Sequence, residues 1–275
     1  MSIDSLRQYV RRFRPPEPTP AVTRLRRLIL VTACVAVGVE AMNLALVEEP
    51  GYPFAVRTGW TLLRVVGFLF LMREVRFGRA AARPFGLILA VTTAFAVVRL
   101  TQPKEGSLVP PGAVVAGFVV LAALCGAVVW QLYRSPAIAA HLHHRPERRP
   151  VPGWVLTARV AVVSLAPLMV VPLLVGLGTI DRAAFATARP AVLSLWAGLA
   201  IVLTLIVPAV GLFLVFGKAW ARWVVGVVSG LILLTQPLLC YLVLGLDGLL
   251  RDGVPLAVTA TLVLVALHRT RTDDR

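Results

Sequence analysis

Glu40, within the apolar residues 28–47, and Arg64, within the apolar residues 56–75, are the most informative pair of ionisable residues in the chain. An unpaired ion costs ~2.5–3.5 kcal/mol at the centre of a bilayer, so such residues are usually paired or functional. Each lies near one end of its stretch, roughly 10 Å deep for a helix that rises 1.5 Å per residue. We therefore predict either an ion pair that packs two helices together or a proton or solute site at Glu40 and Arg64.

A second polar feature, Thr235-Gln236-Pro237, interrupts the apolar stretch 223–245. Proline removes a backbone donor and clashes with the preceding helical turn, so it kinks a helix. A buried glutamine also needs a hydrogen-bond partner in the membrane. The pattern indicates a polar kink, which is either ordinary bending of a membrane helix or part of a broken helix that lines a solute path.

A histidine cluster, His141, His143 and His144, lies between two apolar stretches and beside several arginines. Imidazoles bind metals, but a metal site needs further ligands at suitable spacing. The cluster is therefore a weak metal candidate, and we interpret the segment as a solvated basic linker. We expect no metal and no cofactor.

Catalytic motifs are not found in the sequence. HExxH, GxSxG and the P-loop pattern are all missing, so the common hydrolytic and nucleotide-dependent chemistries have no recognisable signature. The three cysteines, Cys34, Cys125 and Cys240, are far apart within apolar stretches and are typical of small buried hydrophobic residues. We expect that the protein is not an enzyme.

The elements that position these residues are apolar stretches of membrane-spanning length. The chain is 58% hydrophobic and 15% charged, whereas soluble proteins have about 25% charged residues. A helix of about 20 residues crosses the hydrocarbon layer. The sequence predicts an all-α integral membrane protein with about eight transmembrane helices, the last of them short, at residues 28–47, 56–75, 84–100, 112–133, 154–178, 190–215, 223–245 and 254–268.

The distribution of positive charge predicts the topology. With the N-terminus in the cytoplasm, segments on the inside contain 20 Lys or Arg residues and the outside loops contain five. This asymmetry is the positive-inside pattern, and it places both termini in the cytoplasm. Because the net charge of +15 is distributed over loops rather than gathered in a soluble domain, we expect no nucleic-acid partner.

A short phrase occurs twice and indicates an internal repeat. Residues 77–83 read FGRAAAR and residues 216–222, which lie 139 positions later, read FGKAWAR. Both are basic hinges between apolar stretches, and four spans in each half give both halves the same orientation. The chain is therefore interpreted as a parallel repeat of two four-helix halves. The hinge cations are expected to face lipid headgroups or a partner protein, and are Arg79, Arg83, Lys218 and Arg222.

The resulting domain organisation has four segments. They are a basic cytoplasmic arm (1–27), a first four-helix membrane repeat (28–133), a basic histidine-containing cytoplasmic linker (134–153), and a second four-helix membrane repeat with a short C-terminal tail (154–275).

The first functional hypothesis is a non-enzymatic membrane component, either a scaffold or an accessory subunit of another membrane protein. The alternative is a small secondary transporter or permease that uses Glu40 and Arg64 as its coupling site. The expected partners are the bilayer, anionic lipid headgroups on the cytoplasmic face, and a membrane protein. Arginine outnumbers lysine by 26 to 2, which is typical of a GC-rich bacterial genome, so the expected location is a bacterial plasma membrane.

Overall fold

The computed structural model describes residues 17–45, 51–97, 112–142, 153–178, 189–216 and 218–273. All regular secondary structure within these ranges is helical, which confirms the all-α class. The apolar composition explains this outcome, because a chain in hydrocarbon satisfies its backbone polar groups only within a helix or a closed barrel.

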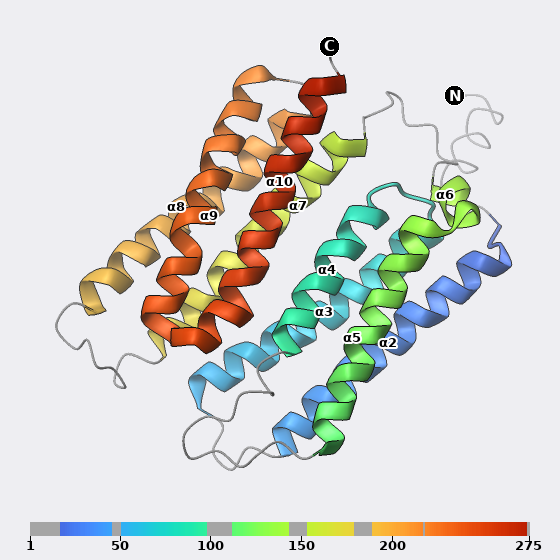
Figure 1. Cartoon of the computed structure of the whole chain (residues 1–275), viewed down its shortest axis with the longest axis horizontal. Helices are drawn as coiled ribbons and strands as arrows, with labels where there is room; N and C mark the ends of the chain where they lie inside the picture. Colours follow the sequence, from blue (N-terminus) through green and yellow to red (C-terminus); the bar gives the residue numbers. More distant parts are fainter. Residues whose placement is uncertain are drawn as a thin grey trace, which may run out of the picture.

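The helices divide into two halves along the chain. The first half contains α2 (Pro20–Ala45), α3 (Tyr52–Arg76), α4 (Ala82–Val97), α5 (Gly112–Arg134) and the short α6 (Pro136–Leu142). The second half contains α7 (Gly153–Leu177), α8 (Arg189–Val215), α9 (Ala219–Gly248), the π-helical turn η3 (Leu249–Gly253) and α10 (Val254–Asp273). Figure 1 shows these two groups side by side, with their long helices running along a common direction.

Six helical runs in the described ranges are long and apolar enough to cross a membrane. The last of them, Ala219–Thr270, is a 52-residue run that contains α9, η3 and α10. The apolar helix α4 falls below the length of the others. The chain is therefore a multi-pass helical membrane protein, whereas the total of eight crossings stays a prediction.

Basic residues gather at one end of the described helices. They stand in the first turns of α2, at the end of α3 and α5, at the start of α9 and at the end of α10, and include Arg24, Arg27, Arg76, Arg134, Arg222 and Arg269. Figure 1 shows these helix ends at the same end of the molecule. Glu40, Asp247 and Asp252 lie near the opposite ends of their helices.

Each half forms a ring of four helices. Helix α2 contacts α3 and α5, and α4 contacts α3 and α5; in the second half α7 contacts α8 and α10, and α9 contacts α8 and α10. Separate apolar clusters fill the two rings, one around Phe68 and Leu132 and the other around Met169 and Val263. The order of neighbours around each ring is thus the same, although α7 and α9 also contact each other across the second ring.

The two halves meet through non-equivalent helices. Helices α3 and α4 contact α7, and α4 also contacts α10 and η3. The first basic hinge joins α3 to α4 and the second joins α8 to α9, so a repeat based on the hinges would make α3 equivalent to α8 and α4 equivalent to α9. The second half nevertheless contacts the first mainly through α7 and α10. Helix α7 is consequently the central helix. In its most apolar 18-residue segment 61% of the residues are buried, against 22–35% in the corresponding segments of the other five runs.

The first basic hinge is a tight helix-ending turn. Gly78 adopts φ 65°, a conformation that glycine tolerates best and that commonly follows a helix. The Arg79 guanidinium pairs with Glu74 at 2.7 Å, and the Arg83 Nε donates to the Leu132 carbonyl at 3.1 Å. These two cations therefore fix the hinge against its own helices.

The second basic hinge is arranged differently in its described part. Lys218 is exposed just before α9, and Arg222 is half-buried in the first turns of that helix. Arg222 also lines an open groove with Trp223 and His268, between α9 and α10.

Candidate functional site: a polar cavity in the first half

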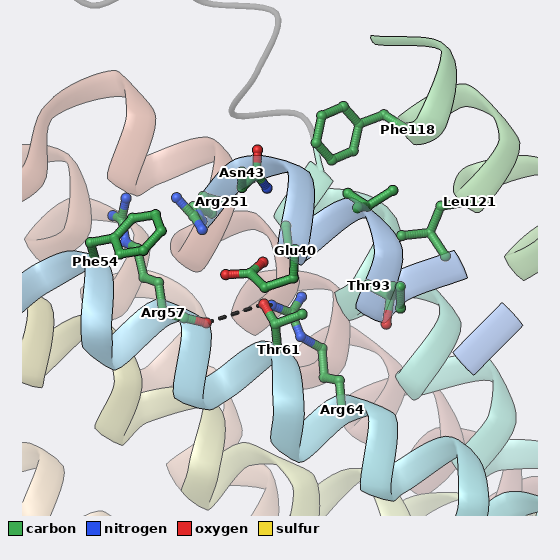
Figure 2. A pocket seen from close by; sticks show the side chains of 13 residues that line it. Glu40, Asn43, Phe54, Arg57, Thr61, Arg64, Thr93, Phe118, Leu121 and Arg251 are labelled. Carbon is green, nitrogen blue, oxygen red and sulfur yellow. Dashed lines mark hydrogen bonds between the residues drawn. The ribbon is translucent and has the colours of Figure 1, made fainter. Parts of the chain in front are cut away.

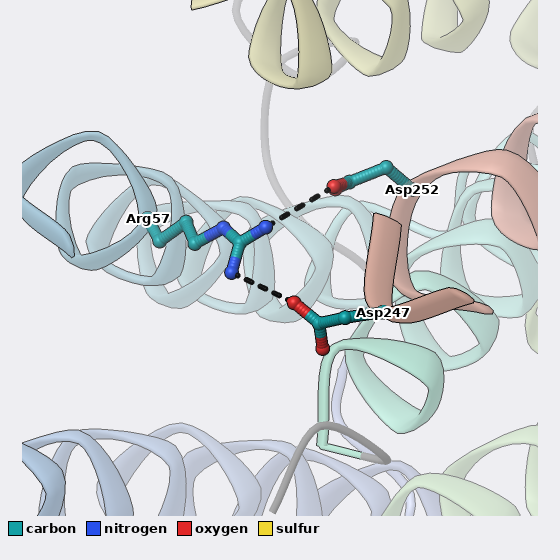
Figure 3. A network of polar contacts seen from close by, with 3 residues as sticks. All are labelled: Arg57, Asp247 and Asp252. Atoms are coloured by element: carbon teal, nitrogen blue, oxygen red, sulfur yellow. Dashed lines mark hydrogen bonds and ion pairs between the residues drawn. The ribbon is translucent and has the colours of Figure 1, made fainter. Parts of the chain in front are cut away.

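The halves are joined by a buried ion cluster at the end opposite the basic helix termini. Arg57, in α3, lies 3.3 Å from Asp247 at the end of α9 and 3.7 Å from Asp252 in η3. Only 8% of the Arg57 side chain and 9% of the Asp252 side chain are exposed. Figure 3 shows the two terminal guanidinium nitrogens each directed at one carboxylate. Such a forked geometry suits arginine, whose planar donors can engage two acceptors at once.

A glycine-rich turn carries both carboxylates. Gly245 breaks the helix with φ 73° and ψ −162°, a region of backbone space that is open almost only to glycine. Gly253 is buried, and a Cβ atom at this position would stand 3.2 Å from the Pro237 Cα atom. The close approach allows the turn to fold back onto the kinked part of α9, and Asp252 then faces α3.

Arg64 lies two helical turns from Arg57 and has different partners. Its side chain is buried, with the residue 5% exposed. The guanidinium donates to the Thr92 carbonyl at 3.0 Å and to the Thr61 hydroxyl at 3.2 Å, and lies 5.9 Å from the Trp60 ring centroid. Its Nε atom is buried without a hydrogen-bond partner. All its hydrogen-bond acceptors are thus neutral.

Glu40 is half-buried on α2 and accepts a hydrogen bond from the Thr58 hydroxyl at 2.6 Å. The ion pair predicted between Glu40 and Arg64 is not formed, because no Glu40 oxygen lies within 4.0 Å of an Arg64 nitrogen. Glu40 instead accepts from a hydroxyl of α3, and Arg64 donates to a carbonyl of α4 and to a hydroxyl of its own helix. They do line one cavity.

This cavity has a volume of about 40 Å³, enough for about three water molecules at 10–15 Å³ each. Figure 2 shows Glu40 and Arg64 directed toward each other across it. The remaining polar lining comes from α2, α3, α4 and η3, and consists of Asn43, Arg57, Thr61, Thr93 and Arg251. A second cavity of about 10 Å³ shares Arg57, Arg64 and Arg251 and extends to Asp252.

The charges of this region balance. Arg57, Arg64 and Arg251 carry three positive charges, and Glu40, Asp247 and Asp252 carry three negative charges. Guanidinium and amide donors can hold a small polar or anionic solute, and a carboxylate such as Glu40 can accept a proton. The described part of the site combines these groups with a water-sized space.

The sequence did not identify Arg57, Asp247 or Asp252 as site residues. Arg57 was considered only as one of the five basic residues of the outside loops. Its contact with Asp247 joins residues that are 190 positions apart in the chain. A usable signal was present in residues 245–253, which read GLDGLLRDG, because two acids and an arginine among three glycines, between two apolar stretches, indicate a tight turn that carries buried charge.

The predicted polar kink lies in the interior of the second half. Gln236 is fully buried and accepts a hydrogen bond from the Trp196 indole nitrogen at 2.8 Å. Thr235 donates to the carbonyl of Leu231 within its own helix at 2.8 Å. Neither side chain lines the cavity described above. Pro237 supports the cavity indirectly, through its contact with the glycine-rich turn.

The histidine cluster is described only at His141. This residue is buried on α6, and its Nε2 lies 3.0 Å from the Val75 carbonyl oxygen, so its ring bridges α6 and the end of α3. His143 and His144 lie outside the described residues. No group of three or more His, Cys, Asp or Glu side chains suited to a metal is present among the described residues.

Comparisons with known proteins give no relative: no protein-family model, no curated protein and no solved structure matches the chain. A functional conclusion for this multi-pass membrane protein therefore depends on the chemistry of its own cavity.

Proposed function

We propose that the protein is a small, non-enzymatic secondary transporter or permease, in which Glu40 and Arg64 take up the solute. The observation that supports this most strongly is the polar cavity itself. If the two residues only packed α2 against α3, a direct ion pair would be the economical arrangement in a membrane. Instead Arg64 is buried against neutral oxygens, beside a space that reaches Glu40.

The position of the cavity fits this proposal. It lies among the four long helices of the first half, and Arg251 of η3 reaches it from the second half, beside the interruption of α9 at Gly245. Interrupted helices of this kind are typical of the solute sites of secondary transporters. We further propose eight crossings with both termini in the cytoplasm of a bacterial cell, two four-helix halves derived from a parallel repeat, and contact of the basic helix ends with anionic lipid headgroups.

Proton flux into liposomes tests the proposal. The full-length protein is reconstituted with a pH-sensitive dye inside, and flux is driven by an imposed membrane potential. We expect the wild-type protein to conduct protons and Glu40→Gln to reduce the flux to the level of empty liposomes. Glu17→Gln is the matched control, because Glu17 is an exposed carboxylate just before α2 and does not line the cavity. Equal flux in all three proteins would refute the proposal.

A second candidate function is a scaffold or an accessory subunit of another membrane protein. The buried Arg57 ion pairs favour it, because they fasten the two halves together. In that case Glu40→Gln would alter stability alone, and a partner would co-purify in fixed stoichiometry from mild detergent. Gel filtration of the native complex, followed by identification of its components, separates this function from transport.

A further inference from the structure

We infer that the cavity binds a small inorganic anion, with the Arg64 guanidinium as its principal ligand. This inference rests on the proposed function, since it names the class of solute taken up at the same site. Its starting point is the Arg64 Nε atom, which is buried and has no hydrogen-bond partner. A buried guanidinium donor without an acceptor costs free energy, and an anion in the adjoining cavity would remove that cost.

The other hydrogen-bond donors around the cavity indicate which class of solute it can bind. The hydroxyls of Thr61 and Thr93 already donate to backbone carbonyls, at 3.1 Å and 2.7 Å. Asn43 also lines the cavity, and its side-chain amide supplies two N–H donors. Arg64 and Asn43 thus supply donors from two different helices, an arrangement suited to an acceptor that has no proton of its own.

The surroundings of the two arginines point the same way. The Arg57 guanidinium is engaged by Asp247 and Asp252, whereas the Arg64 guanidinium makes its hydrogen bonds to neutral oxygens. Because the effective dielectric constant is low in such a site, the charge of Arg64 attracts an anion more strongly than it would in water.

The size of the cavity restricts the anion. A volume of about 40 Å³ has room for about three waters, so a halide fits whereas a bulky organic acid does not. Glu40 opposes the anion when it is ionised. Replacing Glu40 by glutamine should therefore strengthen anion binding, whereas a cation site at Glu40 would be weakened by the same change.

Thermal unfolding of the full-length protein in detergent tests the inference. Tm is measured while sodium chloride replaces sodium gluconate at constant ionic strength. We expect Tm to rise by a few degrees and to saturate, because a ligand that binds only the folded state stabilises it. Bromide should act like chloride. A change in Tm that is linear in chloride and the same in every variant would overturn the inference.

The variants give opposite results for the two key residues. Arg64→Gln should remove the chloride response, whereas Glu40→Gln should lower the half-saturating chloride concentration by about tenfold, through loss of one repulsive charge. Arg76→Gln is the matched control, since Arg76 is exposed at the other end of the same helix. If Arg64→Gln does not fold, Arg64→Lys replaces it and should show a weaker but saturable response. A weaker chloride response in Glu40→Gln would contradict anion binding.

The outcomes also separate this inference from the proposed function. Proton flux that depends on Glu40, together with no saturable chloride response, would overturn the anion site and leave transport standing. A saturable response that depends on Arg64, without Glu40-dependent flux, would support the anion site and count against proton-coupled transport.

Discussion

Arg57 and Arg64 lie seven residues apart on α3, which places them on the same helix face about 10 Å from each other. Their surroundings nevertheless differ. The Arg57 guanidinium contacts two carboxylates from the second half, whereas the Arg64 guanidinium contacts a carbonyl and a hydroxyl within the first half. Arg57 therefore fastens the halves together, and Arg64 keeps its charge available to the cavity.

The same residue type thus serves structure at Arg57 and binding at Arg64. A buried cation with matched carboxylates is already neutralised and gains little from a solute. A buried cation whose partners are neutral is not neutralised, so an anionic solute that binds beside it still stabilises it.

Arg57→Gln should have the largest effect on stability. It leaves Asp247 and Asp252 without their counter-ion in a mostly buried position, and breaking a buried pair in this way typically costs about 3–5 kcal/mol. Unfolding in detergent with increasing denaturant measures the loss. The triple variant Arg57→Gln/Asp247→Asn/Asp252→Asn is the control and should regain much of the stability, because no carboxylate then lacks a partner. A triple variant less stable than Arg57→Gln would show that the ion pairs do not fasten the halves.

Gln236→Leu provides a neutral comparison within the second half. The change leaves the fully buried Trp196 indole N–H without its acceptor, which should cost about 1–3 kcal/mol. Trp196→Phe together with Gln236→Leu should recover part of this, since both polar partners are then removed. The saturable chloride response should persist in both variants, because neither residue lines the cavity; its loss would place the anion elsewhere.

Gly245→Ala tests the turn that carries the carboxylates. A Cβ atom at φ 73° and ψ −162° adds backbone strain of about 1–3 kcal/mol. Gly230→Ala is the matched control on the same helix, where a Cβ would meet no atom within 4 Å. That change should stabilise the helix by about 0.5–1 kcal/mol. Equal effects in the two variants, read by thermal unfolding, would mean that the turn is not restricted to glycine.

Arg64→Gln should have the smallest effect on stability, a change of less than about 1 kcal/mol, because it removes a buried charge and leaves no carboxylate without a contact partner. The same denaturant titration as for Arg57→Gln measures it. A destabilisation as large as that of Arg57→Gln would abolish the distinction between the two arginines.

The apolar stretches predicted the helices well, since a helix overlaps each of them, but the observed helix ends differ from the predicted bounds. Helix α2 begins at Pro20 rather than at residue 28, and Val22 and Leu25 are buried in the first half. The basic residues around them had marked this segment as part of a cytoplasmic arm. Amphipathic packing beyond the membrane-spanning stretch is not visible in hydropathy alone.

The candidate site was predicted in part. Depth along the apolar stretches predicts a similar level for Glu40 and Arg64, because helical rise converts sequence position into height, and both side chains line one cavity. Depth does not specify rotation about the helix axis, so it did not reveal that Thr58 and Thr92 would satisfy the two groups. The Arg57 pairs join distant parts of the chain through a glycine turn, and no local pattern encodes such a contact.

Chloride efflux from liposomes that contain wild-type or Arg64→Gln protein is the most direct test of the account. Equal amounts of folded protein are reconstituted, and efflux is followed with a chloride-selective electrode. We expect chloride efflux from wild-type vesicles and efflux no faster than from empty liposomes with Arg64→Gln. Equal efflux from the two proteins, or none from either, would contradict the claim that Arg64 is held for a solute.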